Sequence, residues 1–458
     1  MPTGGPHHHP PPRLTCTSWA ILDGDTGELL LHCDAFTPVQ IASLTKIMTS
    51  RLVLRLADRE PGLLSELVLI SPEAASMRGT TAELRAGEVY TVRDLLFATM
   101  LPSGNDAAFA LAEYVGDSFS LPDAGERILT SRAAQGTAAA LALTKTARHP
   151  LSAFPSDHPH HRFIAEMNRE AIRLGLRVTR FGNVHGLADA RQQSCAADAA
   201  VLAWAALRQS PVLRELGRTP AYACTARRVE GSGGGASGAG LRTSSGSASA
   251  LGSGRESALL QVRRPYPCVV TWRNSNELLG GTLRVIVGAA PPATPPPGTV
   301  ATPSAAATAG AAPASLAYRY EGLKTGITTT AGGCLASHLT LVDAQPLVGS
   351  AGARGGSGSS SGSSSSSSGS VVSGASSAAS ASTGGASYAS CVSSSPAGVT
   401  PAAPPPYRRS LIVVVLGSSG KSTRFADTHA LAAWAVGALH AAASASPAQA
   451  ATSGGGRA

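Results

Sequence analysis

The sequence predicts an α+β fold, in which an antiparallel sheet flanked by helices carries an inserted all-helical lobe. Two observations support this prediction. Strand-like apolar segments lie toward the two ends of the chain, at 18–23, 29–31, 334–341 and 411–417. Between them, apolar residues recur at helical spacing over 43–56, 91–100, 107–115, 163–175 and 194–207. The sheet should therefore combine strands from both ends of the chain.

Local signals justify the individual elements. The turn-forming stretch 23–27, Asp-Gly-Asp-Thr-Gly, predicts a hairpin between the first two strands. Thr91 stands three residues before Asp94, the spacing of a helix capping box. Pro102 interrupts the helical pattern, so the polar residues after it should lie on a tight connection between two helices. A closing helix is expected over 425–439, because apolar side chains form a stripe there.

Long Gly, Ala, Ser and Pro tracts divide the pattern-bearing sequence. Such tracts bury too little apolar surface to offset the entropy lost on ordering. We expect a leader over 1–15, one large domain over 16–441 and a tail over 442–458. Low-complexity inserts are expected within that domain at about 119–161, 226–260, 291–315 and 343–407.

Charge and cysteine content narrow the function classes. The formal net charge is +9, but the arginines are scattered and not interleaved with aromatic residues, which does not favour nucleic-acid binding. The seven cysteines are widely spaced and form no C-x-x-C pair, which argues against a zinc site or a dense disulfide framework. No stretch is long and apolar enough to span a bilayer. We expect neither a metal nor another cofactor.

The stretch that organises the chain is 42–49, Ala-Ser-Leu-Thr-Lys-Ile-Met-Thr. Ser43 and Lys46 are three residues apart, so their side chains share one face of a helix. A serine hydroxyl is a weak nucleophile until a neighbouring base takes its proton. A lysine amine can act as that base when burial and nearby positive charge lower its pKa. The chain holds only four lysines, at 46, 145, 324 and 421.

Two further motifs give this pair a chemical context. Ser103 and Asn105 form a Ser-x-Asn motif, and Lys324, Thr325 and Gly326 follow as Lys-Thr-Gly. Ser43 would form the acyl-enzyme with Lys46 as base, and Ser103 would relay a proton to the leaving amine. Asn105 would hold Lys46 or the substrate amide. Lys324 and Thr325 would bind a substrate carboxylate, while Gly326 lets a substrate backbone lie along the strand. A second Ser-x-x-Lys, at 418–421, lies in a polar turn and carries little weight.

These motifs, in this order, resemble those of the low-molecular-mass penicillin-binding proteins, the D-alanyl-D-alanine carboxypeptidases of serine peptidase family S11. The similarity extends to Pro102–Ala108, His185–Leu187, Trp272–Asn276 and Ala331–Leu335. It implies a β-lactamase/transpeptidase-like fold. Arg424 stands where the family carries an arginine that helps to bind the terminal carboxylate.

The resemblance implies removal of the terminal D-alanine from peptidoglycan stem peptides, with β-lactams as covalent inhibitors at Ser43. The family works outside the cytoplasm, whereas residues 1–12 lack the basic start and apolar run of a secretory signal. The cellular location is therefore left open, with a plastid among the candidates.

Two alternatives stay open. The first is a β-lactamase or esterase of the same fold, for which Glu166 is a nominal deacylating base. The second is a non-catalytic descendant that binds peptidoglycan. The three intact motifs favour the carboxypeptidase over both.

Overall fold

The computed structural model describes residues 10–119, 158–228, 267–287, 314–346 and 408–444. The chain divides into two units, and all described residues belong to the first, which comprises 1–347 and 406–458. The second unit, 348–405, lies outside the described residues, as do most of the residues in the four expected inserts.

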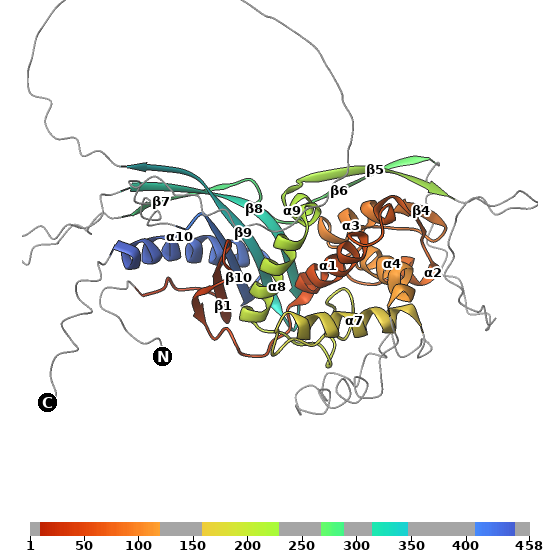
Figure 1. Cartoon of the computed structure of the whole chain (residues 1–458), viewed down its shortest axis with the longest axis horizontal. Helices are drawn as coiled ribbons and strands as arrows, with labels where there is room; N and C mark the ends of the chain where they lie inside the picture. The colour runs from red at the N-terminus through yellow and green to blue at the C-terminus, as the bar shows by residue number, and fades with distance from the viewer. Residues whose placement is uncertain (1–9, 120–157, 229–266, 288–313, 347–407, 445–458) are drawn as a thin grey trace, which may run out of the picture. The chain divides into compact units, whose positions relative to one another are not determined.

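A six-stranded antiparallel sheet combines both ends of the chain, as the sequence predicts (Figure 1). From one edge to the other its strands are β2 (Leu29–Cys33), β1 (Ser18–Asp23), β10 (Ser410–Ser418), β9 (Gly332–Pro346), β8 (Ala314–Thr328) and β7 (Thr282–Val287). The N-terminal β1 pairs with the C-terminal β10 from Ser18↔Leu416 to Asp23↔Leu411.

Both faces of β10 are buried, which explains its uninterrupted apolar run. Successive side chains of a strand point to opposite faces. Val413 and Val415 pack in the cluster that includes α10 (Thr423–Ser444), whereas Ile412 and Val414 belong to the cluster that contains the lobe. The sheet thus joins the closing helix to the helical lobe.

The lobe follows β2 in the chain and carries most of the helices. They are η1 (Ala42–Leu44), α1 (Thr45–Ala57), η2 (Leu63–Ser65), α2 (Pro72–Ala75), α3 (Val92–Met100), α4 (Asn105–Val115), η3 (Gly116–Ser118), α7 (Pro159–Arg173), α8 (Ala196–Gln209) and α9 (Pro211–Arg218). The predicted capping box is present at the start of α3, where Thr91 Oγ1 accepts a hydrogen bond from the Asp94 backbone N–H.

A second, four-stranded sheet borders the lobe and was not anticipated as a unit. Its order is β3 (Leu67–Leu69), β4 (Glu88–Thr91), β5 (Ala221–Arg228) and β6 (Cys268–Arg273). Strand β5 carries few large apolar residues, and most of its side chains are exposed or half-buried. Backbone pairing with β4 and β6, rather than an apolar pattern, defines it.

Several of the expected inserts, and the expected leader and tail, overlap by a few residues with helices, strands or contacts that the structure shows. The insert at 226–260 starts too early because β5 extends to Arg228, and the insert at 119–161 ends too late because α7 begins at Pro159. Strands β8 and β9 likewise extend into the expected inserts at 291–315 and 343–407, and α10 reaches residue 444 of the expected tail. At the other end, the Thr15 N–H donates to Asp427 at 2.9 Å, within the expected leader. Small and polar residues extend these elements through backbone hydrogen bonds, which leave no periodic signal in the sequence.

Within the ranges that the structure describes, the helices are too short or too polar to cross a membrane.

Candidate active site

The Ser43–Lys46 pair lies at the transition from the short 3₁₀ turn η1 into α1. The Thr45 hydroxyl donates to the Ala42 carbonyl at 2.9 Å and braces this turn. Ala42 has a positive φ of 47°, a conformation that is uncommon for a residue with a side chain. The turn leaves Ser43 half-buried at the N-terminal end of α1, while Lys46 lies inside.

Lys46 is fully buried, and three groups among the described residues lie within hydrogen-bond distance of its amine. The amine nitrogen, Nζ, lies 3.0 Å from Ser43 Oγ, 2.7 Å from Asn105 Oδ1 and 2.7 Å from the His185 carbonyl oxygen. Asn105 and His185 come from the start of α4 and from the loop before α8, so three segments converge on one amine. This geometry fixes Nζ within proton-transfer distance of the serine hydroxyl.

The environment of Lys46 favours the neutral amine. Desolvation by burial is the largest effect, and repulsion from the Lys324 ammonium adds to it, so the pKa of Lys46 falls well below its usual 10.5. The Asp106 carboxylate acts in the opposite direction and raises this pKa. A buried amine with a lowered pKa can accept a proton near neutral pH, which a surface lysine cannot.

Asp106 also fixes the loop that faces Asn105. Its carboxylate accepts hydrogen bonds from the backbone N–H groups of Ala82, Leu84 and Ala107, at 2.9 to 3.1 Å. The same loop offers the Arg78 carbonyl, which accepts from Asn105 Nδ2 at 2.7 Å. With its Nδ2 held there, Asn105 presents its oxygen to Lys46.

Lys324, like Lys46, is fully buried. Burial, reinforced by the nearby Arg424 guanidinium, lowers the pKa of Lys324 to about 7. Its amine donates to the Thr325 carbonyl at 3.0 Å. The Thr325 hydroxyl lies 2.7 Å from the Ser275 hydroxyl, in the segment after β6. Ser275 therefore holds the threonine rotamer.

Gly326 and Arg424 complete the neighbourhood of β8. A Cβ atom on Gly326 would lie 2.9 Å from the Ser43 backbone nitrogen, so this close approach requires glycine. The Arg424 guanidinium donates to the Gly326 carbonyl at 2.7 Å and is almost fully buried. Its Nε atom has no hydrogen-bond partner among the described residues. Arg424 thus braces β8 beside Ser43.

Ser103 occupies a strained position between α3 and α4. Its φ is 68°, an uncommon value for a residue other than glycine, and its buried hydroxyl has no hydrogen-bond partner within the described ranges. Strain and an unsatisfied buried hydroxyl are costly, and they concentrate at functional sites.

Two rival candidates lie elsewhere. The Ser418 hydroxyl donates to Asp427 at 2.7 Å, and Lys421 is exposed, so the second Ser-x-x-Lys forms no comparable pair. Glu166 contacts Arg55, in the last turn of α1. Arg55 is nine residues beyond Lys46, roughly 13 Å along the helix. Glu166 is therefore not placed to act as a base beside Ser43.

Sequence reasoning left three contributors without a role: Asp106, the His185 carbonyl and Ser275. Any residue could supply the carbonyl that His185 supplies, so the sequence does not point to it. The Asp106 carboxylate binds backbone N–H groups, so no charged partner in the sequence points to it either. Only the position of Asp106 immediately after Ser-x-Asn points to it. Among the described residues, no group of three His, Cys, Asp or Glu side chains could hold a metal ion.

A buried lysine beside a serine, on an α+β scaffold, is the arrangement expected of a serine–lysine nucleophile site. Comparison with known proteins agrees with this class. The D-alanyl-D-alanine carboxypeptidase family, Peptidase S11, matches residues 6–120 and 159–230. D-alanyl-D-alanine carboxypeptidase DacF of Bacillus subtilis is 28% identical over 205 residues, which cover 45% of this chain and 42% of that protein.

A second relative shows a similar degree of match. DacC of Escherichia coli is 29% identical over 206 residues, covering 44% of this chain and 41% of that protein. The crystal structure of the Streptomyces K15 DD-transpeptidase is 18% identical with a TM-score of 0.49, covering 93% of this chain and 99% of that one. The matched residues are similar to the S11 family, and they span less than half the length of DacF and DacC.

Proposed function

We propose that this protein is a penicillin-binding serine-type D-Ala-D-Ala carboxypeptidase, which removes the terminal D-alanine of peptidoglycan stem peptides through an acyl-enzyme on Ser43. The observation that carries the proposal is the buried Lys46 amine, 3.0 Å from Ser43 Oγ and with its pKa lowered by burial and by Lys324. An amine held in this way is suited to be a general base.

In the acylation step, Lys46 takes the Ser43 proton as Oγ attacks the carbonyl of the penultimate D-alanine. The backbone N–H of Ser43 and an N–H of β8 beyond Gly326 stabilise the resulting oxyanion. The close approach of Gly326 to the Ser43 nitrogen supports this placement.

Other residues handle the leaving group and the substrate. Ser103 passes a proton to the departing D-alanine amine, a role supported by its unsatisfied buried hydroxyl. Asn105 orients Lys46, and also the substrate amide once it is bound. The terminal carboxylate of the substrate is attracted by the positive charges of Lys324 and Arg424, and it accepts a hydrogen bond from the Thr325 hydroxyl. Water then releases the shortened peptide. A β-lactam enters by the same acylation.

The activity is tested by incubating the full chain with fluorescent penicillin and, separately, with a peptide ending in D-Ala-D-Ala. We expect one penicillin adduct per chain, located on Ser43 by peptide mapping, and release of free D-alanine. Ser43→Ala should abolish both signals. Ser418→Ala is the matched control and should leave both intact, because that serine has no adjacent buried lysine. A folded chain that gives neither adduct nor D-alanine would refute the proposal.

Asp106→Asn is expected to move the acid limb of acylation to lower pH. The substitution removes the charge that raises the pKa of Lys46, so the amine loses its proton at lower pH. It also weakens hydrogen bonds to three backbone N–H groups, at a cost of about 1.5–3 kcal/mol in stability. The measurement is the acylation rate by penicillin across pH, together with thermal unfolding.

Asp198→Asn separates these two effects of Asp106→Asn. Asp198 is another buried aspartate that accepts from three backbone N–H groups, those of Arg177, Val178 and Thr179. Its charge is not among the influences on the Lys46 pKa. We expect a similar loss of stability and no movement of the acid limb. Equal pH profiles for wild type and Asp106→Asn would contradict the assigned role of Asp106.

A further inference from the structure

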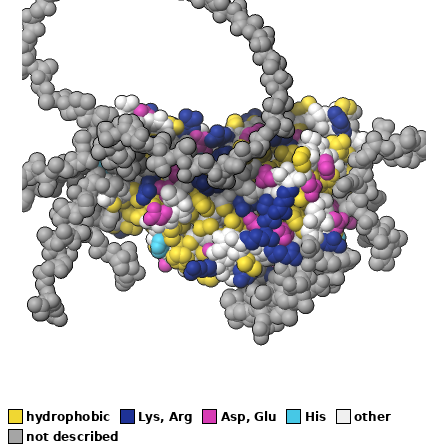
Figure 2. Space-filling model, viewed as in Figure 1, with side chains coloured by type: hydrophobic (Ala, Val, Ile, Leu, Met, Phe, Trp, Pro, Cys, Tyr) yellow, Lys and Arg dark blue, Asp and Glu magenta, His cyan; other side chains and the backbone are white. Residues whose placement is uncertain are grey.

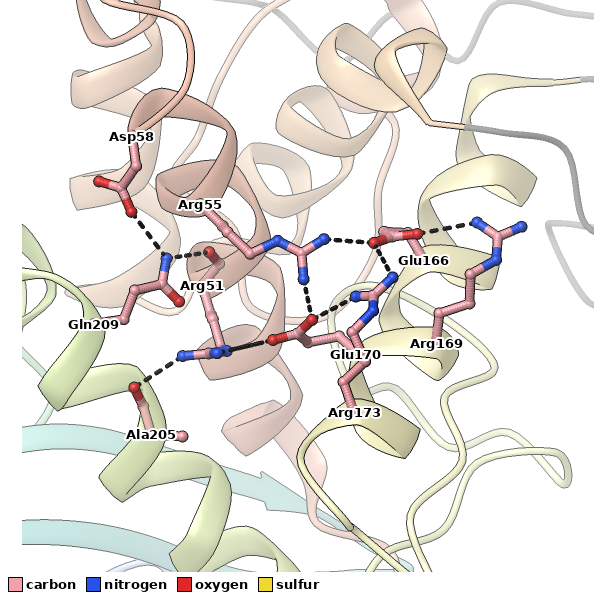
Figure 3. Close-up of polar contacts among 9 residues, drawn as sticks. All are labelled: Arg51, Arg55, Asp58, Glu166, Arg169, Glu170, Arg173, Ala205 and Gln209. Carbon is pink, nitrogen blue, oxygen red and sulfur yellow. Dashed lines mark hydrogen bonds and ion pairs between the residues drawn. The ribbon is translucent and has the colours of Figure 1, made fainter.

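A second cluster of charged side chains links α1 to α7, outside the candidate active site (Figure 3). We call it the arginine–glutamate network, and it consists of Arg51, Arg55, Glu166, Arg169, Glu170 and Arg173. Figure 2 shows basic and acidic side chains gathered together on the viewed face.

The two glutamates lie at the centre of this network. Glu170 accepts from Arg51 at 2.8 Å, and it also pairs with Arg55 and Arg173. Glu166 binds Arg55 at 2.6 Å, with Arg169 and Arg173 as further partners. Burial alone would raise the pKa of Glu166, but hydrogen bonds from Arg169 and Arg173 outweigh it and lower that pKa. Each of the two carboxylates therefore carries its negative charge and forms ion pairs with three arginines.

The network holds more positive than negative charge, because four arginines surround two glutamates. Equal numbers of arginines and glutamates would leave the network neutral. Here each arginine pairs with a glutamate that at least one other arginine shares. The excess charge faces the surface, since the Arg173 side chain is 47% exposed whereas those of Glu166 and Glu170 are 7% and 3% exposed.

A pocket of about 310 Å³ opens at this point. It is lined by Arg55, Leu56, Arg59, Ser118, Phe119, Glu166 and Arg173. Arg59 is exposed, and the structure gives its guanidinium no ion pair or hydrogen bond among the described residues. Three guanidinium groups and one carboxylate line the pocket, and the Glu170 carboxylate beside it also pairs with Arg55 and Arg173. Arg59 adds a fifth arginine to the four arginines and two glutamates of the network, so positive charge is in excess at the pocket.

We propose that this pocket is an anion-binding site for a phosphate group, either free or as a phosphate monoester. The doubly charged form of phosphate compensates more of this excess positive charge than a single carboxylate does. Planar guanidinium groups bind phosphate oxygens in pairs, and the Ser118 hydroxyl adds a neutral donor. The volume lies at the small end of ligand pockets, which leaves room for a substituent on the phosphate.

The test titrates the full chain with inorganic phosphate and with glycerol 3-phosphate at constant ionic strength, followed by ³¹P NMR and calorimetry. We expect saturable binding to the wild type, weakened about tenfold or more in Arg59→Gln. Arg59 is exposed and takes no part in the network, so this variant should fold normally and still form the penicillin adduct. Arg93→Gln is the matched control, because Arg93 is a surface arginine already paired with Glu215 at 2.6 Å. It should bind phosphate as the wild type does.

Equal affinity for the two ligands supports a site for a phosphate ester, and preference for inorganic phosphate supports a site for free phosphate. The proposal is overturned if neither ligand binds saturably. It is also overturned if acetate binds as tightly as phosphate, or if Arg59→Gln and Arg93→Gln bind phosphate equally. Penicillin labelling is measured separately, so a failure of the proposed peptidase function is distinguishable from a failure here.

Discussion

Replacing Lys46 by methionine is expected to slow acylation of Ser43 by penicillin by about 10²- to 10⁴-fold, the usual contribution of a general base. Methionine is an unbranched side chain one heavy atom shorter than lysine, and it removes the proton acceptor that lies 3.0 Å from Ser43 Oγ. The measurement is the second-order rate constant for adduct formation, followed by fluorescence and intact mass.

Lys421→Met provides the control for this substitution. Lys421 belongs to the second Ser-x-x-Lys and is exposed, so its loss should leave the acylation rate unchanged. The Lys46→Met chain should also be checked by circular dichroism, because the Asn105 oxygen and the His185 carbonyl lose a donor. A folded Lys46→Met protein that acylates at the wild-type rate would exclude Lys46 as the base.

Replacing Lys324 by methionine should produce two separable effects. Lys324 repels the Lys46 ammonium, so removing it raises the pKa of Lys46 and moves the acid limb of acylation to higher pH. The same ammonium attracts the substrate carboxylate, and its loss should cost about 2 kcal/mol, a roughly 30-fold rise in KM. Measuring kcat/KM across pH, with an ester substrate that lacks the carboxylate beside one that has it, separates the two effects.

The direction of the wild-type pH dependence follows from the two lysines. Lys46 acts as a base only above its lowered pKa. Lys324 attracts a carboxylate only while protonated, so in the free enzyme this attraction is present below about pH 7 and fades as the pH rises through that value. We expect KM for the carboxylate substrate, but not for the ester, to rise above neutral pH. Identical KM profiles for both substrates would contradict the role given to Lys324.

The main sheet could be predicted because its signals are local and strong. Strand β10 is continuously apolar, and β1 is followed by a clear turn, so the pairing of the two ends of the chain needed only these segments. Strands β5 and β7 were missed for a different reason. In both strands, exposed side chains alternate with side chains that are half-buried or buried. Each strand also ends where the described residues end. Backbone pairing with neighbours distant in sequence is what defines them.

The candidate site divides in the same way. Lysine is rare in this chain, which drew attention to Lys46 and Lys324, and the three-residue spacing to Lys46 pointed to Ser43. The loop held by Asp106 and the carbonyl of His185 could not be predicted, since both act through backbone groups that every residue carries. The arginine–glutamate network was also missed. Its members come from α1 and α7, which are distant in sequence, and their packing is a tertiary property.

The proposed mechanism depends on a Lys46 amine whose pKa is lowered well below its usual 10.5 by burial and by the Lys324 charge. Labelling the lysines with ¹³C and titrating the protein by NMR tests it most directly, since four lysines give few signals. Lys46→Met and Lys324→Met assign the two buried residues. We expect the Lys46 signal to titrate well below 10.5, and at a higher pH once Lys324 is methionine. A Lys46 signal that titrates near 10.5 in the wild type would show that burial and Lys324 do not lower this pKa, and would exclude Lys46 as the general base.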